Sequence, residues 1–144
     1  MYTPFLAGEI ITAGKLNSRL VEEIMEWTPL SDIGTYAGGF SAGTLTPRMR
    51  KIRLLGQERW EYEGRMNVTA GTITANTNTL AFTFNVGYRP SFEHGWQLTG
   101  ASSAFYSVRA TISTAGLLQV GVPTAAGNGV NGIMLDGLFI DAPV

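Results

Sequence analysis

The stretch LAFTFNV, residues 80–86, alternates apolar side chains with small or polar ones at a period of two. In an extended chain, successive side chains point to opposite faces, so the apolar positions of this stretch share one face. These positions are Leu80, Phe82, Phe84 and Val86. The pattern predicts a strand with one face against a core, closed by the Gly- and Pro-containing turn at residues 87–90.

The same period governs most of the chain after residue 48, where turn-forming Gly, Pro and Asn residues separate short alternating stretches. The expected strands cover residues 48–54, 59–63, 66–68, 80–86, 92–98, 106–113, 118–122 and 133–140, the last one bulged at Gly137. Short strands with turn signals at close intervals are typical of a sandwich or jelly roll. We therefore expect a mainly β chain in which residues 48–144 form a jelly-roll-like antiparallel β-sandwich head domain.

Residues 1–28 are expected to form an N-terminal arm followed by a single α-helix. The arm covers residues 1–11, and the helix over 12–27 begins at the N-cap Thr12 and ends before Pro29.

An apolar stripe runs along this expected helix at heptad spacing, with one polar residue in it. The stripe positions that we expect at an oligomer interface are Asn17, Leu20, Ile24 and Trp27. A single Asn at a core position of a coiled coil fixes register and oligomer number. The alternative is that the stripe packs on the chain's own β domain.

Residues 29–47 are rich in Gly, Ser and Thr but carry large apolar residues at intervals. The segment is interpreted as a connector lying along a surface, or as a pair of weak strands. Flexible linkers seldom carry so many large apolar side chains.

The composition fits a β protein whose surface is partly covered by neighbouring subunits. Hydrophobic residues make up 44% of the chain and charged residues 15%, whereas about a quarter charged is usual. The formal net charge of −1 gives no global field for nucleic acid or an anionic membrane. We expect no signal peptide and no membrane insertion, because the sequence has neither a signal-like region nor a long apolar run.

No catalytic or metal-binding constellation appears in the sequence. Cysteine is absent, and the single histidine, His94, has only scattered carboxylates around it in sequence. The neighbouring carboxylates Glu58, Glu61 and Glu63 suggest acid–base chemistry of the glycosidase type, but a solvated, charge-paired strand face explains them better. We therefore expect that the chain is not an enzyme and binds neither a cofactor nor a metal ion.

A basic run, Arg48, Arg50, Lys51 and Arg53, has three interpretations. It contacts nucleic-acid phosphates, pairs with acidic residues of a neighbour such as Glu22, or forms a solvated strand edge. Four charges without interleaved aromatic residues are weak evidence for nucleic acid, so the interface and edge interpretations are favoured.

Aromatic residues near the turns of the β domain are candidates for stacking on sugar rings. Trp96 and Tyr106 are the candidate glycan contacts, and the alternative is that they fill the core or an oligomer axis.

Two parts of the chain resemble bacteriophage proteins. FLAGEIITAGKLNSRL, residues 5–20, resembles the opening segment of many tail and fibre proteins of actinobacterial bacteriophages. LAFTFNVGYRP (80–90), SVRATISTAGLLQV (107–120) and IMLDGLFI (133–140) resemble strands of the trimeric β-sandwich heads of phage fibres and receptor-binding proteins.

This resemblance implies a non-enzymatic virion structural protein, namely a homotrimeric short fibre or a tail-tip receptor-binding module. Residues 1–28 would attach it to other virion proteins, and the head would contact a host-surface glycan. The alternatives are a capsid-mounted decoration or head-fibre protein, and a stand-alone carbohydrate-binding module for cell-wall glycans.

Overall fold

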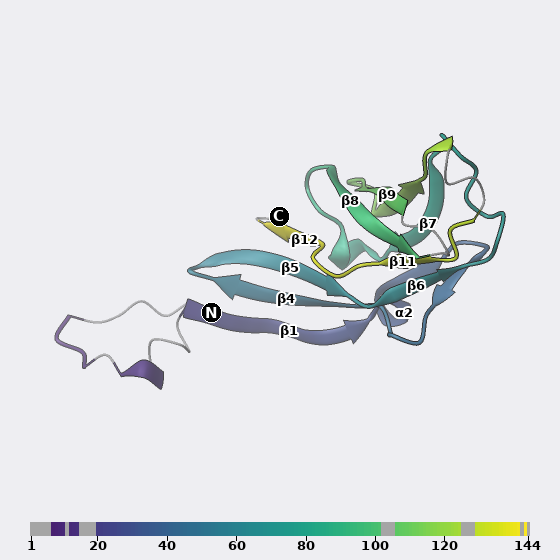
Figure 1. The fold of residues 1–144 in the computed structure, drawn as a ribbon. Helices are drawn as coiled ribbons and strands as arrows, with labels where there is room; N and C mark the ends of the chain where they lie inside the picture. The colour runs from purple at the N-terminus through teal and green to yellow at the C-terminus, as the bar shows by residue number, and fades with distance from the viewer. Residues whose placement is uncertain are drawn as a thin grey trace.

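A computed structural model describes residues 7–10, 12–14, 20–101, 106–124, 129–141 and 143 of the chain. Within them, two antiparallel sheets pack face to face (Figure 1). In chain order the elements are β1 (Val21–Pro29), α2 (Leu30–Ile33), β2 (Gly34–Tyr36), β3 (Phe40–Ala42), β4 (Arg48–Leu54), β5 (Gln57–Glu63), β6 (Arg65–Val68), β7 (Thr79–Phe84), the 3-10 helix η1 (Val86–Tyr88), β8 (His94–Ala101), β9 (Tyr106–Ile112), β10 (Leu117–Gly121), β11 (Gly132–Met134) and β12 (Phe139–Asp141).

The smaller sheet has the strand order β1-β4-β5-β12, and the larger sheet has the order β2-β7-β10-β9-β8-β11-β6-β3. The prediction of a mainly β chain folded as an antiparallel β-sandwich is therefore confirmed. The alternation predicted for β9 is also observed, because Val108, Ala110 and Ile112 are buried while the residues between them face outward.

The core lies between the two sheets and is rich in aromatic rings. Trp60 and Tyr62 from β5 are buried against Phe82 and Phe84 from β7. The Tyr62 and Phe84 rings meet edge to face, with centroids 6.0 Å apart. This geometry suits the quadrupoles of the two rings and joins the sheets directly.

Lys51 ties the turn at residues 87–90 to the smaller sheet. Its ammonium nitrogen lies 4.6 Å from the ring centroid of Trp60 and 4.5 Å from that of Tyr88. The same nitrogen donates a hydrogen bond of 2.8 Å to the carbonyl oxygen of Gly87. Partial burial lowers the pKa of Lys51, while the Glu58 carboxylate acts in the opposite direction.

The predicted helix over 12–27 is wrong over residues 21–27, which belong to strand β1. Residues 15–19, which include Asn17, lie outside the described part of the chain, and Leu20 has a helical conformation.

The long-range contacts of β1 explain why this segment is a strand. Its backbone pairs with β4, and Glu22 forms an ion pair of 2.7 Å with Arg53. Met25 packs against the core. The pairing has irregularities on both sides of Met25, so β1 lacks the regular alternation of period two that marks a strand in the sequence. Tertiary pairing therefore overrides a modest helical propensity.

Residues 29–47 are integrated into the sandwich. They supply the short helix α2 and the strands β2 and β3, which lie at the two edges of the larger sheet. Leu30, Ile33 and Phe40 from this segment are buried in the core. Of the two interpretations of the segment, the pair of weak strands describes it better than the surface connector.

Strand β7 differs in phase from the predicted alternation. Phe82 and Phe84 are buried, but Leu80 is 37% exposed and Ala81 is fully buried. The pairing with β10 skips Ala81, which produces a bulge that turns Leu80 outward. Val86 is 78% exposed because it lies in η1 rather than in the strand.

The expected single strand over 133–140 is two strands in different sheets. β11 pairs with β6 and β8 in the larger sheet, whereas β12 pairs with β5 in the smaller one. Gly137 between them has φ of +81°, a conformation that favours glycine. The chain therefore crosses from one sheet to the other here, where the sequence predicted only a bulge.

The Tyr62 hydroxyl offers a test of this core. It is buried with no hydrogen-bond partner among the described residues, and burial raises the pKa of the phenol. Tyr62→Phe removes this unsatisfied group and keeps the ring contact. We expect its free energy of unfolding in urea to equal that of the wild type or to exceed it by up to about 2 kcal/mol.

Tyr62→Leu serves as the control, because it also loses the edge-to-face contact and should be less stable. A loss of more than about 1 kcal/mol in Tyr62→Phe would contradict an unsatisfied hydroxyl in the core.

Candidate functional site

The outer face of β8, β9 and β10 carries a row of polar side chains. The alternation that buries one side of β9 turns Ser107, Arg109 and Thr111 outward. In the ladder, Gln97 of β8 lies opposite Arg109 on one side, and Gly121 of β10 lies opposite it on the other. Arg109 therefore stands at the middle of a three-strand row.

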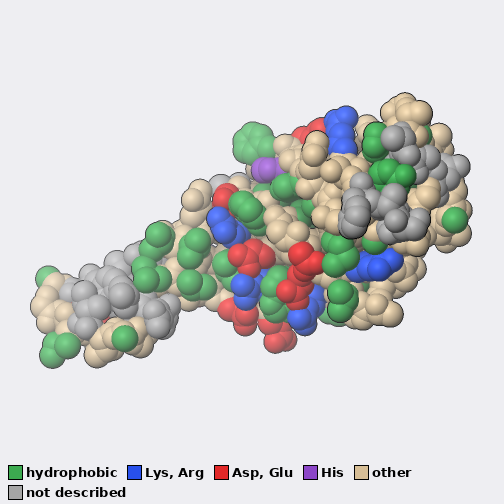
Figure 2. Space-filling view, viewed as in Figure 1, with side chains coloured by type: hydrophobic (Ala, Val, Ile, Leu, Met, Phe, Trp, Pro, Cys, Tyr) green, Lys and Arg blue, Asp and Glu red, His purple; other side chains and the backbone are tan. Residues whose placement is uncertain are grey.

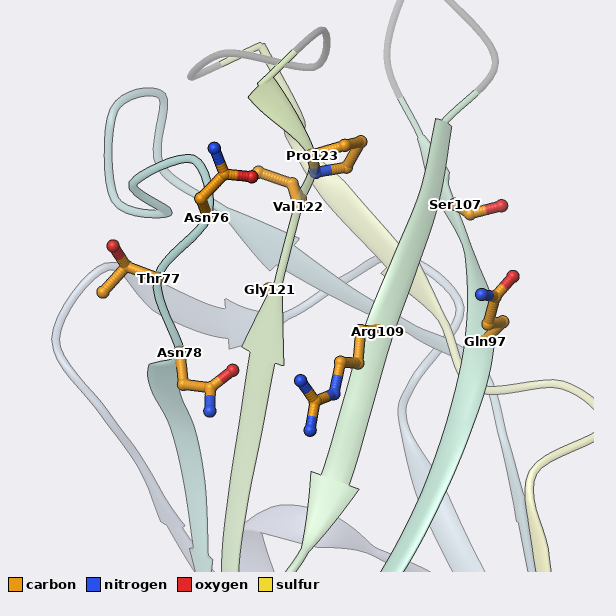
Figure 3. Close-up of a pocket in the computed structure, with 9 residues that line it drawn as sticks. All are labelled: Asn76, Thr77, Asn78, Gln97, Ser107, Arg109, Gly121, Val122 and Pro123. Atoms are coloured by element: carbon orange, nitrogen blue, oxygen red, sulfur yellow. The ribbon is translucent and has the colours of Figure 1, made fainter.

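A hollow of about 400 Å³ lies on the β10 side of this row. In Figure 3 the side chains of Arg109 and Asn78 extend toward each other across β10, where Gly121 has no side chain between them. The hollow is lined by Asn76, Thr77, Asn78, Gln97, Ser107, Arg109, Gly121, Val122 and Pro123.

A second hollow, of about 500 Å³, lies toward the start of β8. It is lined by Glu93, His94, Gly95, Trp96, Gln97, Arg109 and Thr111. Gln97 and Arg109 line both hollows, so the two form one groove, which we call the Arg109 groove. Each volume falls in the range of about 300–1,000 Å³ that is usual for small-molecule sites.

Two glycines keep the floor of the groove open. A Cβ atom at Gly121 would lie 3.5 Å from the Asn78 Oδ1 atom, and one at Gly95 would lie 3.6 Å from the Thr111 Cγ2 atom. Both are ordinary contact distances, so neither glycine is required by crowding. Their effect is to leave space on either side of Arg109.

Arg109 is exposed, and within the described parts of the chain it makes no hydrogen bond or ion pair. The arginines of the smaller sheet differ, because each has a carboxylate partner. Arg50 lies 2.7 Å from Glu61, Arg59 lies 2.6 Å from Asp141, and Arg48 pairs with Glu63. A guanidinium without a carboxylate partner retains its full capacity to bind an anion.

The basic run lies on β4, which is an interior strand between β1 and β5, so its interpretation as a strand edge is wrong. Its arginines pair with carboxylates of their own chain, whereas the interface interpretation placed these partners on a neighbour. Arg48, Arg50 and Arg53 each bind a carboxylate of β5 or β1, and Figure 2 shows acidic and basic side chains intermixed on this surface. Glu61 and Glu63 are the partners of Arg50 and Arg48, so the charge-paired strand face is observed. Exposed pairs of this kind stabilise the fold by roughly 0–1 kcal/mol each.

The candidate glycan contacts, Trp96 and Tyr106, lie partly buried against the core. They are paired with Ala110 and Gly100, respectively. Their positions are four steps apart along β8, from residue 96 to residue 100, which corresponds to about 13 Å. The structure therefore does not bring Trp96 and Tyr106 together into one site.

Trp96 borders the second hollow, where its ring stacks on His94 with centroids 5.9 Å apart. Tyr106 lies at the other end of the strand pair.

Arg109 and Gln97 were not identified from the sequence as site residues. The sequence does place Arg109 outward, but the register that sets Gln97 opposite it is formed only on folding.

The described residues lack the features of a metal site and of a membrane-spanning helix. They contain no group of three or more His, Cys, Asp and Glu side chains placed to hold a metal ion. Across the same residues, no helix has the length and apolar character needed to cross a membrane.

Among solved structures, the fold is similar to that of the receptor binding protein (gp15) of Listeria phage PSA. The TM-score is 0.58 at 14% sequence identity, and the similarity covers 90% of this chain and 71% of that chain. No protein-family model and no curated protein matches the chain. At this level of identity the similarity shows a shared fold.

Two alanine variants test whether the groove glycines serve the fold. In Gly121→Ala the new Cβ meets only ordinary contacts, so we expect a free energy of unfolding within about 0.5 kcal/mol of the wild type. Gly64→Ala is the matched comparison, because Gly64 has φ of +93° and its added Cβ would clash with backbone atoms of Thr46.

For Gly64→Ala we expect a loss of at least about 2 kcal/mol in the same urea titration. If Gly121→Ala were as destabilised as Gly64→Ala, the open floor of the groove would be a requirement of folding, and its role as a site would lose support.

Proposed function

We propose that this chain is a non-enzymatic bacteriophage virion protein that attaches the particle to its host, as a homotrimeric short fibre or tail-tip receptor-binding module. The observation that carries this proposal is the similarity of 90% of the chain to a phage receptor binding protein. The resemblance of residues 5–20 to the opening segment of phage tail and fibre proteins supports it independently of the fold.

Homotrimer formation is supported by exposed apolar side chains near the turn between β4 and β5. Val21 is 47% exposed, Ile24 is 41% exposed and Leu55 is 67% exposed. The N–H of Leu55 donates to the carbonyl oxygen of Leu20 at 2.9 Å, which holds the start of β1 beside the turn. Exposed apolar groups close together are typical of a surface that another subunit covers.

The sequence-derived interface residues are now proposed in this context. Ile24 belongs to this apolar region, and Leu20 adjoins it through the hydrogen bond that its carbonyl oxygen accepts from Leu55. Trp27 lies beneath the guanidinium groups of Arg48 and Arg50, which are 5.4 Å and 4.7 Å from its ring centroid. Asn17 is retained as a proposed interface residue together with residues 1–28, which would also dock on other virion proteins.

Two alternatives each share one part of this proposal: a decoration protein would also belong to the virion, and a carbohydrate-binding module would also bind a glycan. A capsid-mounted decoration or head-fibre protein would use the same trimer at another place on the particle. A stand-alone carbohydrate-binding module is favoured by a separate observation, the polar lining of the Arg109 groove. In the proposed trimer, three such grooves would give avidity without a strong individual site.

The native mass of the full chain tests the oligomer. We expect three times the chain mass of 15.5 kDa in native mass spectrometry. Ile24→Asp should convert the trimer to monomers, because it places a charge in the proposed apolar contact between subunits. Val86→Asp is the matched control, since Val86 is 78% exposed and lies in η1.

A wild-type monomer would contradict the trimer. If both aspartate variants were trimeric, assembly would stand but the contact at Ile24 would be wrong.

Adsorption of phage particles tests the attachment role. Particles of the encoding phage should contain the chain, and particles assembled without it should lose adsorption to host cells. Particles that lack the chain yet adsorb normally would contradict attachment, and reduced particle stability in that case would favour the decoration protein.

A further inference from the structure

We propose that the Arg109 groove binds an acidic saccharide, with a carboxylate or phosphate of the ligand on Arg109 and its hydroxyl groups on the neighbouring amides. This inference rests on the proposed attachment function, because it names the chemical class of the host ligand. It places the main ligand contact at Arg109 and leaves out Tyr106, whereas Trp96 stays in the groove as part of the lining of the second hollow.

The exposed guanidinium group of Arg109, unpaired within the described residues, indicates that the ligand carries a negative charge. Its guanidinium group is exposed and has no hydrogen bond or ion pair among the residues that the structure describes. A planar guanidinium binds a carboxylate or phosphate through two parallel N–H donors. Asn78 extends toward Arg109 (Figure 3) and supplies an amide beside the bound anion.

The other charged or titratable groups of the groove are Glu93 and His94, both at the far end of the second hollow. A carboxylate at that end repels an anionic group, whereas Arg109 attracts it. The acidic group of the ligand is therefore placed at the middle of the groove.

Hydroxyl recognition is indicated by the side chains around Arg109. Gln97, Asn76 and Asn78 carry amides, and Ser107 carries a hydroxyl. As a set these groups donate and accept hydrogen bonds, as sugar hydroxyl groups do. The Asn76 amide nitrogen already donates to the Thr124 hydroxyl, which leaves the Asn76 carbonyl oxygen as an acceptor. The open floors at Gly121 and Gly95 leave one hollow on each side of Arg109, so two linked sugar rings would each occupy one hollow.

Other ligand classes fit this surface less well. β8, β9 and β10 are interior strands of the larger sheet, so their backbone groups are paired and cannot add a peptide strand. A nucleic-acid site uses several cations with stacking aromatic rings, whereas Arg109 is the single Lys or Arg among the residues that line the two hollows.

Binding of three probes to the isotopically labelled full chain tests the proposal by NMR titration. The probes are digalacturonic acid, neutral galactobiose and inorganic phosphate. We expect digalacturonic acid to shift the amide signals of Gly95 and Gly121 and the side-chain signal of Arg109. Its affinity should exceed that of each other probe by about ten-fold or more, because only it engages both the guanidinium and the amides.

Matched variants locate the interaction. Arg109→Gln should weaken digalacturonic acid binding by at least about ten-fold, and Arg109→Lys should weaken it less because the charge remains. Arg48→Gln removes the same charge from the smaller sheet and should leave binding unchanged. Gly121→Thr should weaken binding by filling the first hollow.

Several results would overturn the inference. Equal binding of galactobiose would remove the role of the anion, and equal binding of inorganic phosphate would remove the role of the hollows. Equal losses in Arg48→Gln and Arg109→Gln would reduce the effect to net charge, and no binding by any probe would reject the site.

These outcomes are independent of the adsorption experiment. Failure here with normal incorporation and adsorption of the chain would leave the attachment function intact. Binding here by a chain that is absent from virions would leave the groove intact and reject the virion role.

Discussion

The apolar layer between the two sheets determines which side chains are buried and which are left on the two outer faces. Its centre is the edge-to-face contact between Tyr62 of the smaller sheet and Phe84 of the larger one, with Trp60 and Phe82 beside it. Each strand that crosses this layer must direct alternate side chains inward. The side chains between them are then placed on the two outer faces, where they are available for other roles.

The two outer faces differ in how their charged side chains are paired. On the smaller sheet, arginines and carboxylates pair across neighbouring strands, as Arg50 does with Glu61, so most of their charge is satisfied within the chain. On the larger sheet, Arg109 has no such partner among the described residues, and Gly121 and Gly95 leave space around it. The first face is suited to a stable exterior or a subunit contact, and the second is suited to a ligand.

The sequence predicted the local elements best where a single period was uninterrupted. β9 shows this, because every second residue from Val108 to Ile112 is buried as expected. The helix predicted through Trp27 was wrong because β1 pairs irregularly, without a clear alternation of period two, and because its pairing with β4 is a long-range contact. The phase of β7 was wrong at Leu80 for a related reason, since the bulge at Ala81 depends on the partner strand β10. The crossing at Gly137 likewise depends on where both sheets lie.

The Arg109 groove could not be predicted from the sequence, because it forms only through the register in which the three strands pair. Gln97, Arg109 and Gly121 are distant in the chain and meet only when β8, β9 and β10 align. The alternation could place Arg109 outward, but it could not show which side chains flank it or that two of its neighbours are glycines. Trp96 and Tyr106 were predicted as glycan contacts from their residue type alone, and the strands direct both side chains partly into the core.

Cryo-electron microscopy of phage particles assembled in the presence of this chain tests the proposed attachment role and the proposed ligand groove together. We expect density for three copies of this fold around one axis at the adsorption end of the particle, with the Arg109 groove of each copy facing solvent. Absence of the chain from the particle, or grooves covered by neighbouring subunits, would contradict this expectation.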